Sequence, residues 1–182
     1  ETIHGMLATS LEENPEEIIQ TIASFKKALF GAPLSYTIPS AIDNRIPLSE
    51  IIIGQLVGGN LAIVASMLGS ESQLNTDGKI LFIEEIGEYK YSIDRMLQSL
   101  KRAGYFTKLK AVIVGDISSI KQNSTNWGSS VEQLILEVVP QQIPVLFNFP
   151  AGHEADNRAL IFGRNIQLVA DKENYSVIFS NN

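Results

Sequence analysis

The sequence has no cysteine, only two histidines and a single tryptophan. Without cysteine the chain has no disulfide, no thiol nucleophile and no Cys-rich zinc site. The two histidines, His4 and His153, stand near opposite ends of the sequence and form no short-spaced metal motif. Redox chemistry at thiols and the common structural zinc sites are therefore excluded.

Positive charge and long apolar runs are also scarce. Fourteen Lys and Arg stand against 20 Asp and Glu, for a net charge of -6 and a sequence pI near 4.9. No basic cluster is longer than two residues, which argues against a nucleic-acid partner. The apolar run Leu61–Leu68 is well short of the ~20 residues that span a bilayer. The first residues, which include no starting Met, lack the pattern of a signal peptide and are compatible with a chain that begins inside a longer gene product.

The first regular element expected is an amphipathic helix from Pro15 to Phe30. Asn14 suits the N-cap, Glu17 the third position of a capping box, and Gly31 the C-terminal stop. The expected apolar stripe consists of Ile18, Ile22, Phe25 and Leu29. We expect this stripe to need a partner, and to cause association or mobility if its partner lies outside the chain.

A proline-rich stretch, Gly31 to Glu50, then reads as a linker with one short strand, Leu34–Ile38. Beyond it strands alternate with helices, which predicts parallel pairing in the middle of a sheet, and a β-rich tail makes that sheet mixed. The strands expected are Ile51–Val57, Lys79–Ile83, Leu109–Val114, Pro144–Phe149, Ala159–Ile161, Ile166–Val169 and Tyr175–Phe179. The helices expected are Leu61–Leu68, Tyr91–Ala103 and Ser129–Val139. The fold class is α/β, and 182 residues allow one core or one domain with a piece of another.

Three expected core strands run into polar sequence that carries Glu84, Asp116 and His153. Ligands of open α/β sheets collect beyond the carboxyl ends of parallel strands, so these side chains should share one rim. A carboxylate beside an imidazole is the orienting half of a nucleophilic triad. The simpler alternatives are that Glu84 caps a turn, that His153 is a solvated loop residue, and that Asp116 is a turn residue.

Other polar positions favour structural roles. Gly58-Gly59-Asn60 follows a strand but lacks both G-x-G-x-x-G and the Lys-Ser/Thr of a P-loop, so we interpret it as a tight turn. His4 is interpreted as structural, as is the pair Asp94-Arg95 in the first turn of a helix.

A nucleophile is missing from the pattern. The sequence has no G-x-S-x-G, and no serine lies between glycines at a strand-to-helix elbow. The serines of Gly69–Ser72 and Gly128–Ser130 fall in expected loops with no strand before them. With no cysteine either, this chain offers no credible acyl-transfer nucleophile.

Several segments, in order, resemble one family. Gly54–Leu61 is similar to the G-x-x-x-G-G-N-L segment of the LD-carboxypeptidases. Gly78–Glu88 and Tyr91–Leu97 resemble that family's next segment, in which a strand ends in the catalytic Glu and an I-D-R-x-L helix follows. Gly152-His153, with Asn157 and Gly163, resembles the loop that holds the catalytic His. His4-Gly5 resembles an H-G-P segment that follows the nucleophile, with Met6 in place of Pro.

This resemblance implies a two-domain serine peptidase. Residues 1–45 would be the end of a flavodoxin-like nucleophile domain, and residues 46–182 the swivelling β/β/α C-terminal domain. Glu84 would orient His153, and His153 would deprotonate a serine on a preceding segment that is absent from this chain. Glu84 is preferred to Glu85 because the match places it first after the strand, and neighbours on a strand point to opposite faces.

The substrate implied is a murein tetrapeptide, cut at the amide between an L-centre and the terminal D-alanine. The resemblance also implies no cofactor or metal, a cytoplasmic location and a homodimer, with no membrane or nucleic-acid partner. Three alternatives remain. Relatives with the same triad cleave peptide-nucleotide antibiotics and confer immunity to microcins, the chain could be a non-catalytic interaction module, or it could be a nucleotide-binding domain supported only by Gly58-Gly59.

Overall fold

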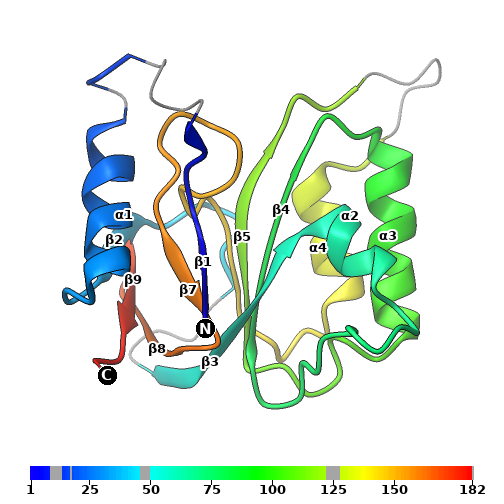
Figure 1. Cartoon of the computed structure of the whole chain (residues 1–182). Coiled ribbons are helices and arrows are strands. Elements are labelled where there is room, and N and C mark those ends of the chain that lie inside the picture. Colours follow the sequence, from blue (N-terminus) through cyan, green and yellow to red (C-terminus); the bar gives the residue numbers. More distant parts are fainter. Residues whose placement is uncertain (9–13, 17, 46–49, 122–127, 182) are drawn as a thin grey trace.

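The computed structural model describes residues 1–8, 14–16, 18–45, 50–121 and 128–181 as a mixed α/β fold (Figure 1). The strands are β1 (Thr2–His4), β2 (Ser35–Pro39), β3 (Ile51–Asn60), β4 (Ile80–Ile86), β5 (Ala111–Ser118), β6 (Val145–Leu146), β7 (Leu160–Phe162), β8 (Asn165–Ala170) and β9 (Asn174–Phe179). The helices are α1 (Ile19–Phe30), α2 (Leu61–Ser66), α3 (Lys90–Arg102) and α4 (Val131–Val138). No helix in these ranges is long and apolar enough to cross a membrane.

A seven-stranded mixed sheet organises the chain in the order β2-β9-β8-β3-β4-β5-β6. The strands β3 to β6 are parallel, whereas β8 pairs antiparallel with β3 and β9, and β9 pairs antiparallel with β2. A separate antiparallel pair joins β1 to β7. The expected α/β class with a mixed sheet is confirmed. The strand β2 belongs to the expected linker, so residues on both sides of the expected domain boundary contribute to one sheet.

Two hydrophobic clusters lie on the two faces of the parallel strands. On one face, side chains of β4 and β5 such as Leu81, Ile83 and Val112 pack with Leu97 and Ile135 of the helices. The helices α2, α3 and α4 all cover this face (Figure 1). Both faces of β4 are buried, which explains why the strand is an uninterrupted apolar run before Glu84.

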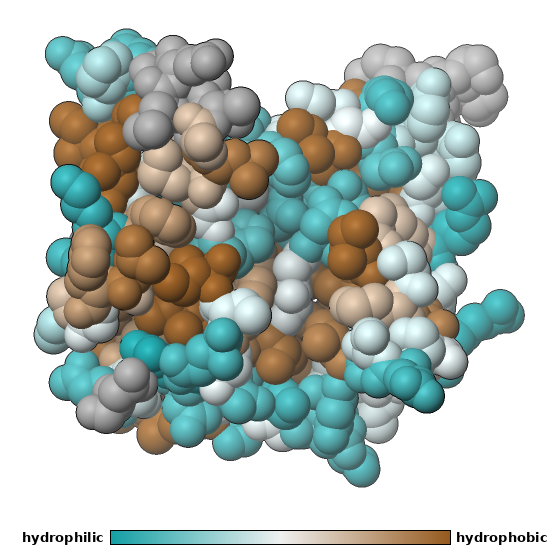
Figure 2. Space-filling view, viewed as in Figure 1, coloured by the Kyte–Doolittle hydropathy of each residue, from teal (hydrophilic) through white to brown (hydrophobic). Residues whose placement is uncertain are grey.

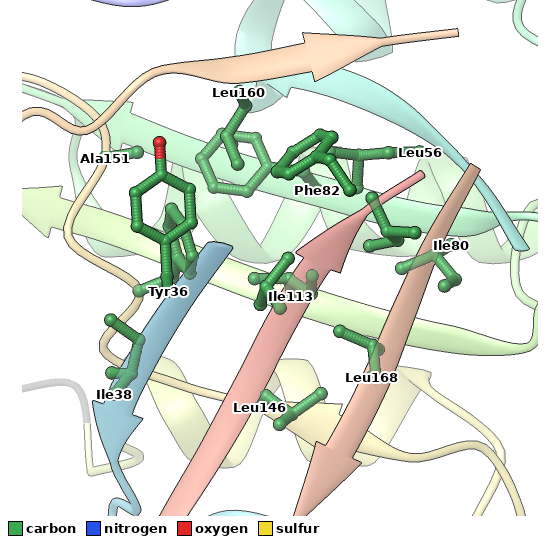
Figure 3. Packing of buried hydrophobic residues seen from close by; sticks show 14 of the residues in the cluster. Tyr36, Ile38, Leu56, Ile80, Phe82, Ile113, Leu146, Ala151, Leu160 and Leu168 are labelled. Carbon is green, nitrogen blue, oxygen red and sulfur yellow. The ribbon is translucent and has the colours of Figure 1, made fainter. Parts of the chain in front are cut away.

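The second cluster fills the space between the parallel strands and the β-rich tail. Phe82 and Ile113 of the parallel strands meet Tyr36, Leu160 and Leu168 from β2, β7 and β8 (Figure 3). The Tyr36 hydroxyl is buried in this cluster and donates a hydrogen bond to the carbonyl of Ala159. The antiparallel part of the sheet, β2, β9 and β8, together with β7, therefore packs against the face of the parallel strands opposite the three helices.

The helix α1 begins later than expected, so the expectation of a start at Pro15 was wrong. Residues 15 and 16 form a turn, in which the Asn14 side chain accepts a hydrogen bond from the Glu16 backbone at 3.1 Å. The helix starts at Ile19 without a side-chain cap. Glu17, the expected capping-box residue, lies outside the described residues. The expected end is confirmed, because Gly31 closes the helix in the left-handed conformation with φ 71°.

The buried face of α1 agrees only in part with the expected apolar stripe. Ile18 is buried and Phe25 packs against the core, but Leu29 is 56% exposed. The buried residues within the helix are Thr21, Ser24 and Ala28. The polar side chains are buried because they hydrogen-bond to the backbone of residues 155–159. This helix therefore has a packing partner inside the chain, and the expectation that its inner face would be left without one was wrong.

Gly58, Gly59 and Asn60 do not form the expected tight turn. They continue β3 to its end, and the Asn60 side chain then caps α2 by accepting a hydrogen bond from Ile63 N at 3.2 Å. Gly58 has φ 135°, and a Cβ there would stand 1.9 Å from the carbonyl oxygen of Phe82. The glycine therefore allows β3 to approach β4 closely, which is a different reason for glycine from the turn that the sequence suggested.

Candidate active site

A hydrogen bond joins Glu84 and His153 across 69 residues of sequence. Glu84 Oε2 lies 2.8 Å from His153 Nδ1. Glu84 is 1% exposed and sits inside β4, which continues to Ile86 rather than ending before Glu84 as the sequence suggested. The His153 side chain is 41% exposed in the loop after β6. A buried carboxylate thus orients an imidazole that solvent, or another molecule, can reach.

The loop that carries His153 requires glycine at its start. Gly152 has φ 150°, and a Cβ there would stand 2.8 Å from the Cβ of Asp116 at the end of β5. Its backbone N–H donates to the Asn157 side chain at 3.2 Å. The neighbouring Glu154 N–H lies 3.4 Å from Asp116 Oδ2. The loop is therefore held by Asn157, which belongs to the loop itself, and by Asp116 of the neighbouring strand β5.

The buried polar face of α1 fixes the far side of the same loop. Thr21 Oγ1 donates to the Ala155 carbonyl at 2.7 Å and accepts from Asn157 N at 2.8 Å. Ser24 Oγ accepts from Ala159 N at 3.0 Å. A helix that sequence reasoning treated as packing alone thus supports the segment that presents His153.

His4 is the third group at the site. Its Nε2 lies 3.9 Å from Glu84 Oε1, and its ring packs edge-on against Phe82, with centroids 5.4 Å apart. It also meets Phe162 at 5.7 Å. The position of His4 before Gly5 near the start of the sequence favours a structural role when it is taken alone. The signal that could have found it was the His4-Gly5 match, since a segment shared with a family of triad enzymes is a candidate for the site.

Two opposing effects act on Glu84. Burial raises its pKa, but the imidazoles of His4 and His153 beside the carboxylate lower it, and the balance leaves the pKa below the ordinary value. Glu84 is consequently an anion near neutral pH. That charge stabilises the Nδ1–H form of His153 and an imidazolium at this position.

Asp116 shares the rim with Glu84 and His153, as expected, but it contacts the loop and not the imidazole. Burial, with the nearby carboxylates of Glu154 and Glu84, raises the pKa of Asp116 to about 6, although the Glu154 N–H opposes this. Asp116 also lines a cavity of about 330 Å³ with Glu132 and Asn148, between the end of β5 and α4. Its contacts make it a support of the His153 loop.

Glu85 points to the opposite face of β4. Its carboxylate accepts hydrogen bonds from Asn60 Nδ2 at 2.9 Å, Ala62 N at 2.8 Å and Ile86 N at 2.9 Å. It therefore holds the end of β3 and the start of α2. Strand alternation predicts that only one of the two neighbouring carboxylates faces His153, and here that carboxylate is Glu84.

The arrangement can orient and charge an imidazole, and Nε2 of His153 is left as the basic nitrogen when Nδ1–H faces Glu84. In the described part of the chain, no serine or threonine hydroxyl is hydrogen-bonded to His153. The same ranges hold no group of three or more His, Asp or Glu that could bind a metal ion. In the space-filling view, hydrophilic residues occupy the centre of the upper half of the face shown (Figure 2).

Comparison with known proteins identifies the family of this chain. Residues 53–168 match the model of the LD-carboxypeptidase C-terminal domain. The probable murein peptide carboxypeptidase of Bacillus subtilis is 33% identical over 168 residues, which is 89% of this chain and 51% of the relative. The microcin C7 self-immunity protein MccF of Escherichia coli is 30% identical over 131 residues, which is 68% of this chain and 36% of the relative.

A solved structure agrees with the sequence matches. The muramoyltetrapeptide carboxypeptidase of Oxalobacter formigenes superposes with a TM-score of 0.78 at 27% identity, covering 89% of this chain and 55% of that one. The chain spans about half the length of the curated relatives it matches. From the family match, the shared fold and the buried carboxylate–imidazole pair, we conclude that this chain belongs to the LD-carboxypeptidase family and comprises its C-terminal domain.

Proposed function

We propose that this chain supplies the Glu and the His of a Ser-Glu-His triad in a serine LD-carboxypeptidase. Glu84 is the orienting carboxylate and His153 the general base, and the serine comes from a segment outside this chain. In this proposal residues 1–45 end the nucleophile domain and residues 46–182 form the C-terminal domain. The observation that supports it is the 2.8 Å contact between Glu84 Oε2 and His153 Nδ1.

The chemistry follows from that contact. His153 donates Nδ1–H to Glu84, so Nε2 takes the proton of the serine hydroxyl as the serine attacks the scissile carbonyl. The imidazolium is stabilised by the buried carboxylate and then gives the proton to the departing amine. The bond cut is the amide between an L-centre, of diaminopimelate or lysine, and a terminal D-alanine. Water, activated by the same imidazole, then hydrolyses the acyl-serine ester, which releases the shortened peptide as a carboxylate and restores the serine hydroxyl.

The experiment is D-alanine release from a murein tetrapeptide. The full-length protein, its Glu84→Ala and His153→Ala variants, and this chain alone are compared. We expect activity only in the unsubstituted full-length protein. If the full-length protein is active and indifferent to His153→Ala, the assignment of the base is wrong. If neither protein has activity on any peptide tested, the interpretation as an interaction module is favoured.

A second candidate is cleavage of a peptide-nucleotide antibiotic. It is favoured by the 30% identity to the microcin C7 self-immunity protein over 131 residues. The triad chemistry would be unchanged, because only the groups on either side of the scissile amide differ. Equal amounts of full-length protein, offered a murein tetrapeptide and an aminoacyl sulfamoyl adenosine, would separate the two by their kcat/KM values.

We further propose that the protein acts in the cytoplasm as a homodimer, on murein peptides, without a metal, a cofactor, a membrane or a nucleic-acid partner. The low content of basic residues supports the last point. The remaining points rest on family membership. Light scattering of the full-length protein measures the oligomer, and activity in the presence of a chelator tests the absence of a metal.

A further inference from the structure

The Glu84 carboxylate lies between two imidazoles, one on each oxygen. Oε2 is 2.8 Å from His153 Nδ1, and Oε1 is 3.9 Å from His4 Nε2. The second distance is too long for a hydrogen bond but short enough for an electrostatic contact between the imidazole and the carboxylate. The reaction proposed above uses only the first imidazole. The role of the second is therefore open.

The surroundings of His4 determine how its ring can act. Phe82 and Phe162 pack against the ring, and the His4 side chain is only 19% exposed. Its Nδ1 is buried without a hydrogen-bond partner among the described residues. A proton on Nδ1 would be an unsatisfied buried donor, so the neutral ring carries its proton on Nε2, the nitrogen that faces Glu84.

The backbone keeps His4 at this place. His4 is the last residue of β1 and pairs with Leu160 of β7, and Phe162 lies on the same strand β7. The carboxylate comes from β4, and His153 from the loop after β6. Three separate parts of the chain thus meet at one carboxylate. A Glu side chain has three rotatable bonds, so a contact on each oxygen restrains its orientation more than one contact does.

We propose that His4 is a positioning residue, which holds the Glu84 carboxylate in the orientation that pairs with His153. The inference rests on the proposed function, since it assigns a role within the same triad. The proposed role of His4 requires no contact with the substrate or the serine. It acts through Glu84, by presenting Nε2–H to the oxygen that His153 does not use.

The charge on Glu84 is the property that His4 should control. The titratable groups around Glu84 are His153, His4 and Asp116. Burial raises the pKa of Glu84, and the two imidazoles lower it. Loss of the His4 imidazole should therefore move the pKa of Glu84 upward. Loss of packing around His4 should not.

The test uses carboxyl ¹³C titration of Glu84 in this chain, with the signal assigned from Glu84→Gln. His4→Phe keeps an aromatic ring but removes the N–H, and His4→Gln keeps an N–H near the position of Nε2. Phe162→Leu is the matched control, because it removes an aromatic contact of His4 and leaves the imidazole. We expect the titration to shift to higher pH in His4→Phe, and to stay near the original in His4→Gln and Phe162→Leu.

A second measurement follows the Nδ1 proton of His153, which resonates far downfield when it is bound to a carboxylate. It should exchange with water faster in His4→Phe and be preserved in His4→Gln. An unchanged titration and an unchanged proton in folded His4→Phe would overturn the proposal. An equal change in Phe162→Leu would overturn it too, because packing alone would then explain the effect. Thermal unfolding shows which variants are folded.

Kinetics of the full-length protein separate this inference from the proposed function. In His4→Phe we expect kcat to fall roughly tenfold with KM little changed, and in His4→Gln to recover most of the loss. A rise in KM with kcat unchanged would contradict a positioning role. If the full-length protein proves inactive on every substrate, the proposed function fails, whereas the titration in this chain still decides the contact between His4 and Glu84.

Discussion

The two faces of β4 carry neighbouring carboxylates, Glu84 and Glu85, with different surroundings. Both residues are buried, at 1% and 3% exposure. Glu85 accepts three hydrogen bonds from Asn60, Ala62 and Ile86, and these tie a strand end to a helix start. Glu84 faces two histidines, one of them on an accessible loop. Burial of a carboxylate therefore does not by itself indicate its role. Hydrogen bonds from nearby backbone N–H groups indicate a structural role, whereas a contact with a solvent-accessible imidazole indicates a candidate catalytic role.

The sharpest way to break this comparison is a pair of isosteric substitutions. In the full-length protein, Glu84→Gln should lower kcat by about 10³-fold or more, because an amide cannot stabilise the imidazolium and favours the wrong tautomer of His153. Glu85→Gln should leave kcat per folded molecule within a few-fold. D-alanine release measured at matched folded concentration checks both. Equal losses in the two variants would remove the distinction between the faces.

The next largest effect concerns the spacing between β3 and β4, which sets Asn60 opposite Glu84 in the strand register and lets its side chain donate to Glu85. Gly58→Ala should destabilise this chain by about 4 kcal/mol or more, since its Cβ would stand 1.9 Å from the Phe82 carbonyl oxygen. The matched control is Gly59→Ala, which has φ 145° and no atom within 4 Å, and should cost about 1–2 kcal/mol from backbone strain alone. Urea unfolding measures both. Similar values would show that the two strands are not held at this spacing.

Removal of the structural carboxylate should have a smaller effect on stability. Glu85→Ala leaves the donors of Asn60, Ala62 and Ile86 without their acceptor, and should lower the free energy of unfolding by about 2–3 kcal/mol. Hydrogen exchange should be faster at the start of α2 than in α3. A variant as stable as the parent would mean that water replaces the carboxylate at no cost.

The smallest effect is expected at Asp116, whose carboxylate supports the loop of His153. Its folded-state pKa is raised from 3.8 to about 6. Between these pH values the folded chain binds a proton that the unfolded chain has released, so this group's contribution to stability decreases as the pH rises through the window. Asp116→Asn should therefore stabilise the chain at pH 7 and have little effect near pH 4. Urea unfolding across this range tests it, and a pH-independent difference would contradict the burial of the charge.

The sequence predicted the elements well where periodicity and turn residues agreed. The strands β4 and β5 are apolar runs buried on both faces, and α3 has its apolar side chains at helical spacing, so local pattern and tertiary environment led to the same assignment. Prediction was poorer where the environment reverses a local preference. Thr21 and Ser24 look like surface residues, yet they are buried because loop backbone groups need them as partners. Gly58-Gly59 looks like a turn, yet it is strand because β4 comes too close for a side chain.

For the site, the order of residues along the chain indicated that a carboxylate and an imidazole follow core strands. The resemblance to the LD-carboxypeptidases selected Glu84 over Glu85, and strand alternation supported choosing only one of the two. Glu84 and His153 could therefore be named as candidates without a structure, together with the lack of a nucleophile motif in this sequence. Only the tertiary structure decided that His4, 80 residues before Glu84 in sequence, meets the same carboxylate, and that α1 supports the His153 loop. The physical reason is that periodicity records only which face a residue takes on its own element, whereas contacts between elements depend on how strands such as β1 and β7 pair across the chain.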